Sequence, residues 1–340
     1  MATYSCGVIE PFFLEHSVYL SPFIIISIVI AVFLDYVIIT KSKDLGTFKY
    51  YILNQAIWAQ LYEIVLIIES PVIFNNCLGA VFTGFLLRSI GSYRFTQILT
   101  IGAISLLGNT FAAVILSMVN RFLFVFTPSK RVYMDNKYTL TLIIVFIIIF
   151  HILFASAILL SSTDAETCKQ LAVHETGDSL VKYFNEPSFY YAGENEGKTR
   201  FIGFVIFCMI SFAVLPFAAC IIVFIIHVVY NSKSLHSKVL TARSLVMVVT
   251  VQAMLCVCMV MFPTMWILAS WTWNLNHDIE LTNYVIILLS LHGIADAICT
   301  FYCVMPYRRY VISLFVSKKP AVPAPASNTS ARISRGQVHG

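Results

Sequence analysis

The chain has 340 residues, of which 59% are hydrophobic and 11% charged, and its formal net charge is +5. Soluble globular domains carry about 25% charged residues, so this composition excludes a soluble domain. The basic residues stand singly between apolar runs rather than in one stripe, so we expect no nucleic-acid partner. No motif in the chain predicts a cofactor.

Seven apolar runs are long enough to cross a lipid bilayer, for which a helix needs about 20 residues. The sequence therefore predicts an all-α membrane protein with a seven-transmembrane helix bundle in residues 18–305. Residues 1–17 precede it, and 306–340 form a tail expected to be disordered from about 317 because Pro, Ala and Ser dominate it. In chain order, the runs are 18–40, 50–73, 96–120, 138–160, 201–228, 244–269 and 282–305.

The second run is the most polar and is expected inside the bundle, whereas the fourth is almost entirely apolar and is expected to face lipid. The stretch 77–87 has only 11 residues. A segment that short is expected to pack at the outer mouth of the bundle rather than to cross the membrane.

The orientation follows from the Lys and Arg residues outside the runs, because cytoplasmic loops are enriched in them. Sixteen lie on the side of the C-terminal tail and six on the other side, which includes the long acidic loop 161–200. The N-terminus is therefore predicted to be extracellular and the C-terminus cytoplasmic. Counting 77–87 as an eighth span would place the basic tail outside, so we reject that topology.

Ionisable side chains within the runs are costly in a membrane and mark candidate functional positions. Glu63 is the most deeply placed carboxylate, and His292 lies one helical turn before Asp296 on the same face. We interpret these three residues as an intramembrane polar network that fixes helix packing, with a conformational switch as the alternative. Glu69, near the outer end of the second run, is a candidate ligand contact, although solvation by the outer vestibule explains it as well.

An enzymatic function is not expected. His292 and Asp296 have the spacing of a metal-ligand pair, but an intramembrane zinc hydrolase needs three protein ligands and an activated water. No second pair of this kind and no catalytic triad or redox-cysteine motif is present. We therefore predict neither a catalytic residue nor a metal site.

Several stretches in chain order resemble nematode serpentine chemoreceptors of the Str superfamily, nearest to class H (Srh) or class I (Sri). The likeness covers most of 45–125 and 205–312, and the choice between the two classes stays open. It is carried by LGTFKYYILNQAIW and ESPVIF around the second run, NRFLFV after the third, SLHSKVLTARSLVMVVTVQ and MFPTMW in the sixth, and MPYRRYV closing the seventh.

This resemblance implies a G-protein-coupled chemosensory receptor that binds a small external chemical, such as an odorant, and activates a heterotrimeric G protein. It implies a multi-pass location in the plasma membrane, specifically in the ciliary membrane of sensory neurons. G-protein coupling is expected at Asn120 and Arg121, which end the third span, and at Tyr307 and Arg308. The class usually has an acidic residue before Asn-Arg, whereas this chain has Val119.

The same resemblance places the ligand among side chains in the outer half of the bundle, and depth in the membrane selects the candidates. Pro263 in the sixth span is expected to kink its helix, because proline removes a backbone hydrogen bond and clashes with the preceding turn. The other candidates beside Glu69 are Tyr93, Gln97, Thr100, Phe204, Phe207, Ser211, Met265 and Trp266.

Three cysteines are predicted outside the membrane: Cys6, Cys77 and Cys168. Receptors of this architecture often tie the long outer loop to the region before the third span, which favours a Cys77–Cys168 disulfide. The odd count leaves Cys6 as a competitor. A functional alternative also remains, a seven-transmembrane ligand-gated ion channel of inverted topology, against which the charge distribution argues.

Overall fold

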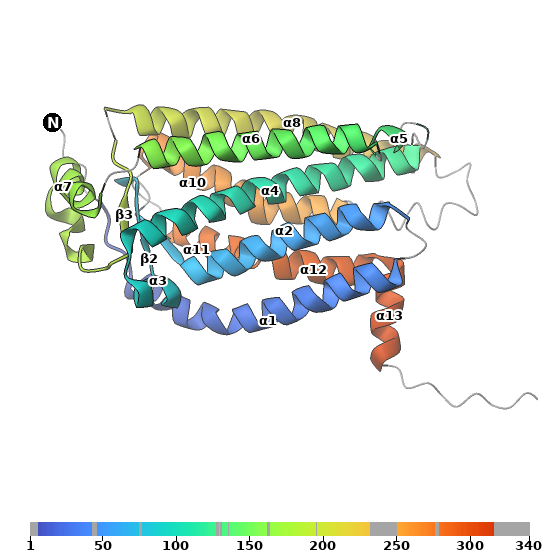
Figure 1. Ribbon diagram of the computed structural model, residues 1–340, viewed down its shortest axis with the longest axis horizontal. Coiled ribbons are helices and arrows are strands. Elements are labelled where there is room, and N and C mark those ends of the chain that lie inside the picture. Colours follow the sequence, from blue (N-terminus) through green and yellow to red (C-terminus); the bar gives the residue numbers. More distant parts are fainter. Residues whose placement is uncertain are drawn as a thin grey trace, which may run out of the picture.

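The computed structural model is dominated by long helices that form one elongated bundle (Figure 1). The residues it describes are 6–42, 46–74, 77–126, 129, 131–134, 136–161, 164–194, 196–231, 250–275 and 279–315. The bundle consists of α1 (Pro11–Lys41), α2 (Phe48–Glu69), α4 (Tyr93–Phe126), α6 (Lys137–Ser161), α8 (Lys198–Asn231), the helical segment Thr250–Trp273, and the pair α11 (Ile279–Leu289) and α12 (His292–Cys303).

The described part of each predicted run falls on one of these helical segments, except that the second run continues beyond α2 to residue 73 and the seventh beyond α12 to residue 305. The predicted seven-helix architecture is confirmed. In the described part of the chain, α1, α2, Tyr93–Asn120 of α4 and Thr250–Trp273 are each long and apolar enough to span a bilayer. The pair α11 and α12, bent by 43°, qualifies together as a fifth span. With 25 and 34 residues, α6 and α8 also exceed the length that a crossing requires.

Helix α2 lies at the centre of the bundle, where it contacts α1, α4 and α12. In the most apolar 18-residue stretch of α2, 56% of the residues are buried, compared with 28% in the corresponding stretch of α1 and 22% in that of α4. In contrast, α6 exposes Ile144, Phe146 and Ile148. Both expectations about these helices, a buried second span and a lipid-facing fourth, therefore agree with the structure.

One end of the bundle carries a compact cap, which includes the stretch 77–87 expected at the outer mouth and part of the acidic loop 161–200; its small sheet was not expected from the sequence. We call this the cap end (Figure 1). It contains a three-stranded antiparallel sheet in the order β1 (Pro71–Ile73), β2 (Gly79–Phe82), β3 (Phe189–Tyr191). It also contains α3 (Phe85–Ile90), α7 (Ala165–Thr176) and a 3-10 helix at Gly177–Tyr183.

The sheet forms because α2 stops before the end of its apolar run. Ser70 adopts a left-handed conformation with φ 42°, and its amide closes the helix on the Leu66 carbonyl oxygen. Pro71 then starts β1, where its missing amide proton is tolerated. The returning chain passes so close to α2 that a Cβ on Gly84 would overlap the Ile68 carbonyl oxygen, so only glycine fits. The stretch 77–87 accordingly forms β2 and the start of α3 rather than a span.

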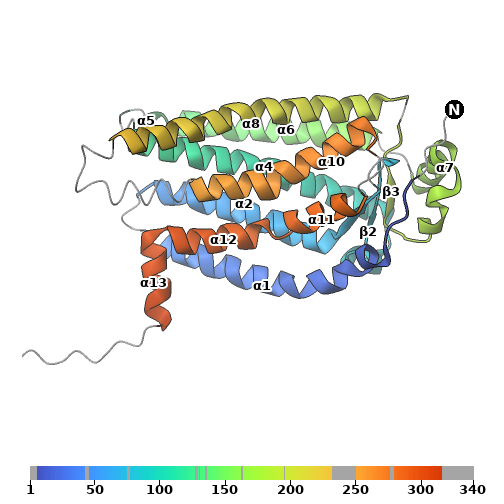
Figure 2. The ribbon, with the colours of Figure 1, turned by 180° about the vertical axis from the view of Figure 1, so that it is seen from behind.

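The other end, here called the tail end, carries α5 (Arg131–Met134) and α13 (Met305–Phe315). Helix α13 turns away sharply from α12, as both ribbon views show (Figures 1 and 2). Tyr307 on α13 is fully buried against α1, α2 and α12, and its hydroxyl lies 2.5 Å from the Ser42 hydroxyl. The tail therefore begins with a docked helix, although the sequence pattern indicated only a basic end to the last span.

Candidate functional site

The cap end contains a cavity of about 580 Å³ between α4, α6 and the start of α7. Tyr93 and Gln97, two of the predicted ligand contacts, line it together with Arg94 and Asp164. The Tyr93 ring stacks on Tyr190 with 6.1 Å between the ring centroids, which ties this wall to β3. The cavity offers a phenol, an amide, a guanidinium and a carboxylate, groups that would orient a small molecule with polar substituents.

Asp164 has a second role, because it is the N-cap of α7. Its carboxylate accepts hydrogen bonds from the Thr167 amide (3.3 Å) and hydroxyl (2.5 Å). These two bonds lower the pKa of the Asp164 carboxyl below its ordinary value. The carboxylate is therefore ionised at neutral pH and gives the cavity a fixed negative charge.

The remaining ligand candidates lie elsewhere in the cap-end half of the bundle. The Ser211 hydroxyl of α8 lies 3.8 Å from the Met265 sulfur of α10 (Phe262–Trp273). Phe207 and Phe204 meet Trp273 edge to face, with ring centroids 4.9 and 6.2 Å apart. These residues form a contact between α8 and α10 separate from the cavity.

Two further candidates are hydrogen-bonded within the bundle, and a third is a buried carboxyl group. The Trp266 indole donates to the Thr282 hydroxyl at 3.1 Å, and the Thr100 hydroxyl donates to the Thr96 carbonyl at 2.9 Å. Glu69 is 2% exposed at the C-terminal end of α2, and its Oε1 has no hydrogen-bond partner among the described residues. The structure therefore divides the predicted pocket into a cavity at Tyr93 and Gln97, an α8–α10 contact and a buried carboxylate.

Pro263 lies in the first turn of α10, directly after a π-helical segment at Val257–Met261. A proline cannot donate the backbone hydrogen bond of a regular α-helix, and a π-helical turn is one way to absorb the irregularity. The sixth span therefore changes helix type directly before Pro263, the position at which a kink was expected.

The intramembrane polar network is centred on the first turn of α12. Glu63 is fully buried on α2, and its Oε2 accepts a 2.6 Å hydrogen bond from the Ile294 amide. The carboxylate therefore caps α12 where the seventh span is broken, because the first amides of a helix lack partners within it. Gly293 makes this approach possible, since a Cβ there would collide with the Glu63 carboxylate and lie 3.1 Å from the Ala59 carbonyl oxygen.

Asp296 accepts hydrogen bonds from two glutamines, neither of which the pattern of ionisable residues indicates. Gln55 of α2 donates to both carboxylate oxygens at 3.4 and 3.3 Å, and Gln252 donates to Oδ1 at 3.2 Å and to the Thr300 hydroxyl at 2.9 Å. His292 is buried one turn earlier, and its Nδ1 has no partner within the described part of the chain. A search for polar amides as well as ionisable groups would have found both glutamines.

The tail end holds the residues expected to meet a G protein. Asn120 is fully buried on α4, and neither polar atom of its side chain is hydrogen-bonded to a described residue. The side chain of Arg121 lies outside the described part. The Arg308 guanidinium lies 5.9 Å from the centroid of the Tyr302 ring, and Lys41 of α1 lies 4.3 Å from that of Tyr310.

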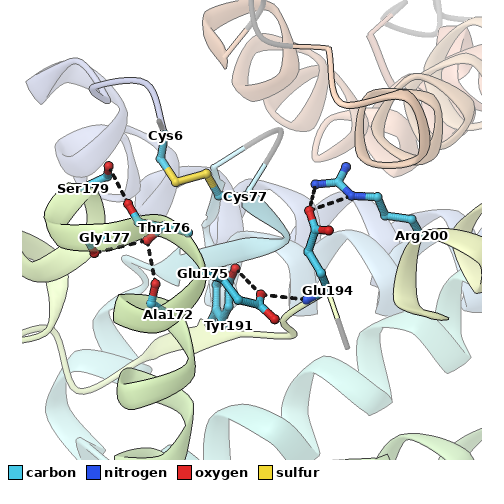
Figure 3. The surroundings of a disulfide bond; sticks show 10 residues. All are labelled: Cys6, Cys77, Ala172, Glu175, Thr176, Gly177, Ser179, Tyr191, Glu194 and Arg200. Atoms are coloured by element: carbon cyan, nitrogen blue, oxygen red, sulfur yellow. Dashed lines mark hydrogen bonds and ion pairs between the residues drawn. A yellow bond between two sulfur atoms is a disulfide. The ribbon is translucent and has the colours of Figure 1, made fainter. Parts of the chain in front are cut away.

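The predicted Cys77–Cys168 disulfide is wrong in this structure, which joins Cys6 to Cys77 (Figure 3). All three cysteines belong to one hydrophobic cluster of the cap, so proximity alone did not decide the pairing. Cys168 faces β3, where the Tyr191 amide donates to its sulfur at 3.2 Å and the thiol donates to the Tyr191 carbonyl at 3.4 Å. Because β3 is absent from the sequence expectation, this competing partner was missed.

A hydrogen-bonded chain connects the cap to the sixth span, and Figure 3 shows its part from Tyr191 to Arg200. The Tyr191 hydroxyl and the Glu194 amide both donate to Glu175 Oε2, at 2.7 and 2.8 Å. Glu194 in turn accepts from Arg200 Nε at 2.9 Å, and Arg200 donates to the Trp271 carbonyl oxygen. With side-chain exposures of 15% and 18%, the Arg200–Glu194 pair is largely shielded from solvent.

No group of three or more His, Cys, Asp or Glu side chains in the described part is arranged to hold a metal ion. The helical bundle, its cap and its buried polar network are those of a membrane-embedded seven-helix receptor. The chain matches the family model described as "Serpentine type 7TM GPCR chemoreceptor Srh" over residues 10–317, and it belongs to that family. This match resolves the open choice between classes H and I in favour of class H. No curated protein matches the chain.

Proposed function

We propose that this receptor binds a small external chemical at its cap end and activates a heterotrimeric G protein at its tail end. The observation that carries the proposal is the cap-end cavity, in which Tyr93, Gln97 and Asp164 offer polar groups at the mouth of an apolar bundle. Membership of a chemoreceptor family supports this assignment over that of an ion channel or an enzyme.

The orientation that this function needs has the cap end outside the cell. Two observations support it: the excess of Lys and Arg on the tail side, and the Cys6–Cys77 disulfide, because disulfides persist in oxidising environments. The location that we propose is the plasma membrane, and for a chemoreceptor of this kind the sensory cilium.

Activation requires that the ligand bind one arrangement of the bundle better than another. We propose that this difference in ligand affinity acts through the seventh span, which is broken between α11 and α12. The Asn283 side chain binds α11 to β1 of the cap, because it accepts a hydrogen bond from the Ile73 amide at 3.0 Å and donates one to the Ile73 carbonyl oxygen at 3.2 Å. Glu63 and Asp296 hold α12 against α2 through separate hydrogen bonds. The two halves of the seventh span, α11 and α12, can therefore shift relative to each other.

The test is a chemical screen in cells that report calcium or cyclic nucleotide, followed by nucleotide-exchange assays on the purified receptor. With an agonist in hand, Gln97→Ala should weaken agonist potency about five- to tenfold, the cost of one lost hydrogen bond. Ile104→Ala, at an exposed site on the same helix outside the cavity, is the control. Equal agonist potency in both variants would show that the agonist does not bind in this cavity.

Arg121→Ala is expected to abolish agonist-driven exchange while surface expression stays intact. Lys137→Ala, which removes a positive charge at the same end of the bundle, should retain exchange. Undiminished exchange in the Arg121 variant would argue against the coupling role of that residue.

A further inference from the structure

The cap-end cavity brings together two side chains of opposite charge from different helices. Arg94 belongs to the first turn of α4, and Asp164 is the N-cap of α7. The two side chains form no ion pair with each other, although both line the same cavity. Among the described residues, no other charged side chain lines it. A molecule that fills this cavity therefore meets one positive and one negative group.

Both charged groups retain the capacity to bind a ligand. The Ser92 hydroxyl accepts a hydrogen bond from the Phe95 amide at 3.4 Å, which fixes the start of α4 and with it the position of Arg94. The Arg94 guanidinium carries five N–H donors and forms no ion pair with a described residue. The two hydrogen bonds from Thr167 use about half of the lone pairs of the Asp164 carboxylate. That carboxylate can therefore still accept from a cation.

The rest of the lining includes an apolar surface beside these charges. Ile98 of α4 and Leu159 of α6 are both more than half exposed, and Ala165 of α7 lies next to Asp164. An apolar group of a ligand would cover these side chains, and the hydrophobic effect would favour its binding. The cavity therefore fits a molecule that joins an apolar group to charged ones.

The balance of charge in the cavity disfavours a ligand with a single charge. An amine bound to Asp164 would bring its ammonium group near Arg94, and a carboxylic acid bound to Arg94 would bring its carboxylate near Asp164. Such like-charge contacts oppose binding. A neutral ligand would displace water from both charged side chains without replacing its interactions with them. A ligand that carries one charge of each sign offers a partner to both side chains.

We propose that the cap-end cavity binds an α-amino acid with an apolar side chain, such as leucine. The carboxylate of the amino acid accepts hydrogen bonds from the Arg94 guanidinium, and its ammonium group donates to the Asp164 carboxylate. Its side chain packs on Ile98 and Leu159. This inference rests on the proposed function, because it names the class of external chemical that the same cavity would bind.

The test compares three compounds that share one apolar group. The full-length receptor would be reconstituted in phosphatidylcholine nanodiscs, and the binding of each compound measured by isothermal titration calorimetry. Leucine carries both charges, isoamylamine lacks the carboxylate, and isocaproate lacks the ammonium group. We expect leucine to bind at least about tenfold more tightly than either of the others, because each has lost its charge-assisted hydrogen bonds to one side chain.

Two variants separate the roles of the charged side chains. Asp164→Asn keeps an equally good N-cap for α7 but removes the negative charge. It should weaken leucine binding at least about tenfold and strengthen isocaproate binding, since the like charge is gone. Arg94→Gln should also weaken leucine binding and should strengthen isoamylamine binding instead. Glu166→Gln and Lys182→Gln, at exposed cap positions outside the lining, are the matched controls and should bind leucine unchanged.

Thermal unfolding would verify that each variant is folded before its binding is compared. A folded receptor that does not bind leucine would overturn the proposal, as would isoamylamine or isocaproate bound as tightly as leucine. Equal losses in the Asp164 and Glu166 variants would overturn it too. An agonist of another chemical class that Gln97→Ala weakens would then still support the proposed function. Conversely, leucine that binds as expected but drives no nucleotide exchange would contradict the proposed function alone.

Discussion

Single residues decide how closely the helices of this receptor approach one another, and Gly293 is the clearest case. Its lack of a side chain lets the Glu63 carboxylate reach the amides of α12. The sequence indicated that Glu63, His292 and Asp296 act together, but it could not show that Glu63 bonds to backbone rather than to a side chain. That detail depends on the break between α11 and α12 at Ser290 and Leu291, which lies inside a continuous apolar run.

Gly293→Ala should therefore destabilise the receptor by about 1–3 kcal/mol, because the added methyl group overpacks a filled site. Gly102→Ala is the matched control, since a Cβ on this helical glycine of α4 would meet nothing within 4 Å. Thermal unfolding of the purified variants measures the difference. A Gly293 variant as stable as the Gly102 variant would show that the Glu63 cap does not require this close approach.

The three cap cysteines make a second prediction at the residue scale. Burial raises the pKa of the Cys168 thiol, so at pH 8 it should hold less thiolate than an exposed cysteine. Maleimide should thus modify it slowly in the folded receptor and quickly after unfolding. Peptide mapping without reduction should join Cys6 to Cys77, whereas a peptide linked through Cys168 would contradict the pairing described here.

At the scale of elements, the sequence predicted the long helices and missed the sheet of the cap. Runs of about 20 apolar residues have few alternatives in a membrane, so length alone located the spans. Strands of three or four residues, such as β1 and β3, leave no periodic pattern, and the pairing of β2 with β3 joins segments more than 100 residues apart. The small sheet and the split of the predicted pocket therefore needed the structure.

The link between the cap and α10 can be tested through Glu194, which bonds Arg200 in a shielded site. Glu194→Gln should lower stability by about 1–3 kcal/mol because it weakens charge-assisted hydrogen bonds to Arg200. Glu196→Gln is the control, since its ion pair with Lys198 spans 3.7 Å and is mostly exposed. Such surface pairs contribute at most about 1 kcal/mol. Thermal unfolding compares the two variants, and equal losses would mean that the Arg200 pair does not hold the cap.

At the scale of the whole molecule, successive long helices run alternately toward the tail end and toward the cap end, which agrees with seven crossings. The count of spans and the family could be anticipated because they rest on composition and on motifs distributed over most of the chain. The functional assignments at each end rest on side chains, and their contacts could be placed only in three dimensions.

The orientation of the bundle predicts how tagged receptors will stain. An epitope at the N-terminus should be accessible to antibody on intact cells, because the cap end faces outward in our proposal. An epitope after residue 340 should stain only after permeabilisation. The reverse pattern would place the cap in the cytoplasm and rule out the proposed receptor topology.

The Cys6–Cys77 bond also imposes an order of events during synthesis. Its two cysteines are 71 residues apart and enclose all of α1 and α2. At 5–20 residues per second, the second cysteine follows the first by roughly 4–14 seconds. The ring can close only after both helices have been made, and it can do so while the other five spans are still to come. The receptor can thus acquire a covalently fixed first hairpin that is already complete when the later helices arrive to pack against α2.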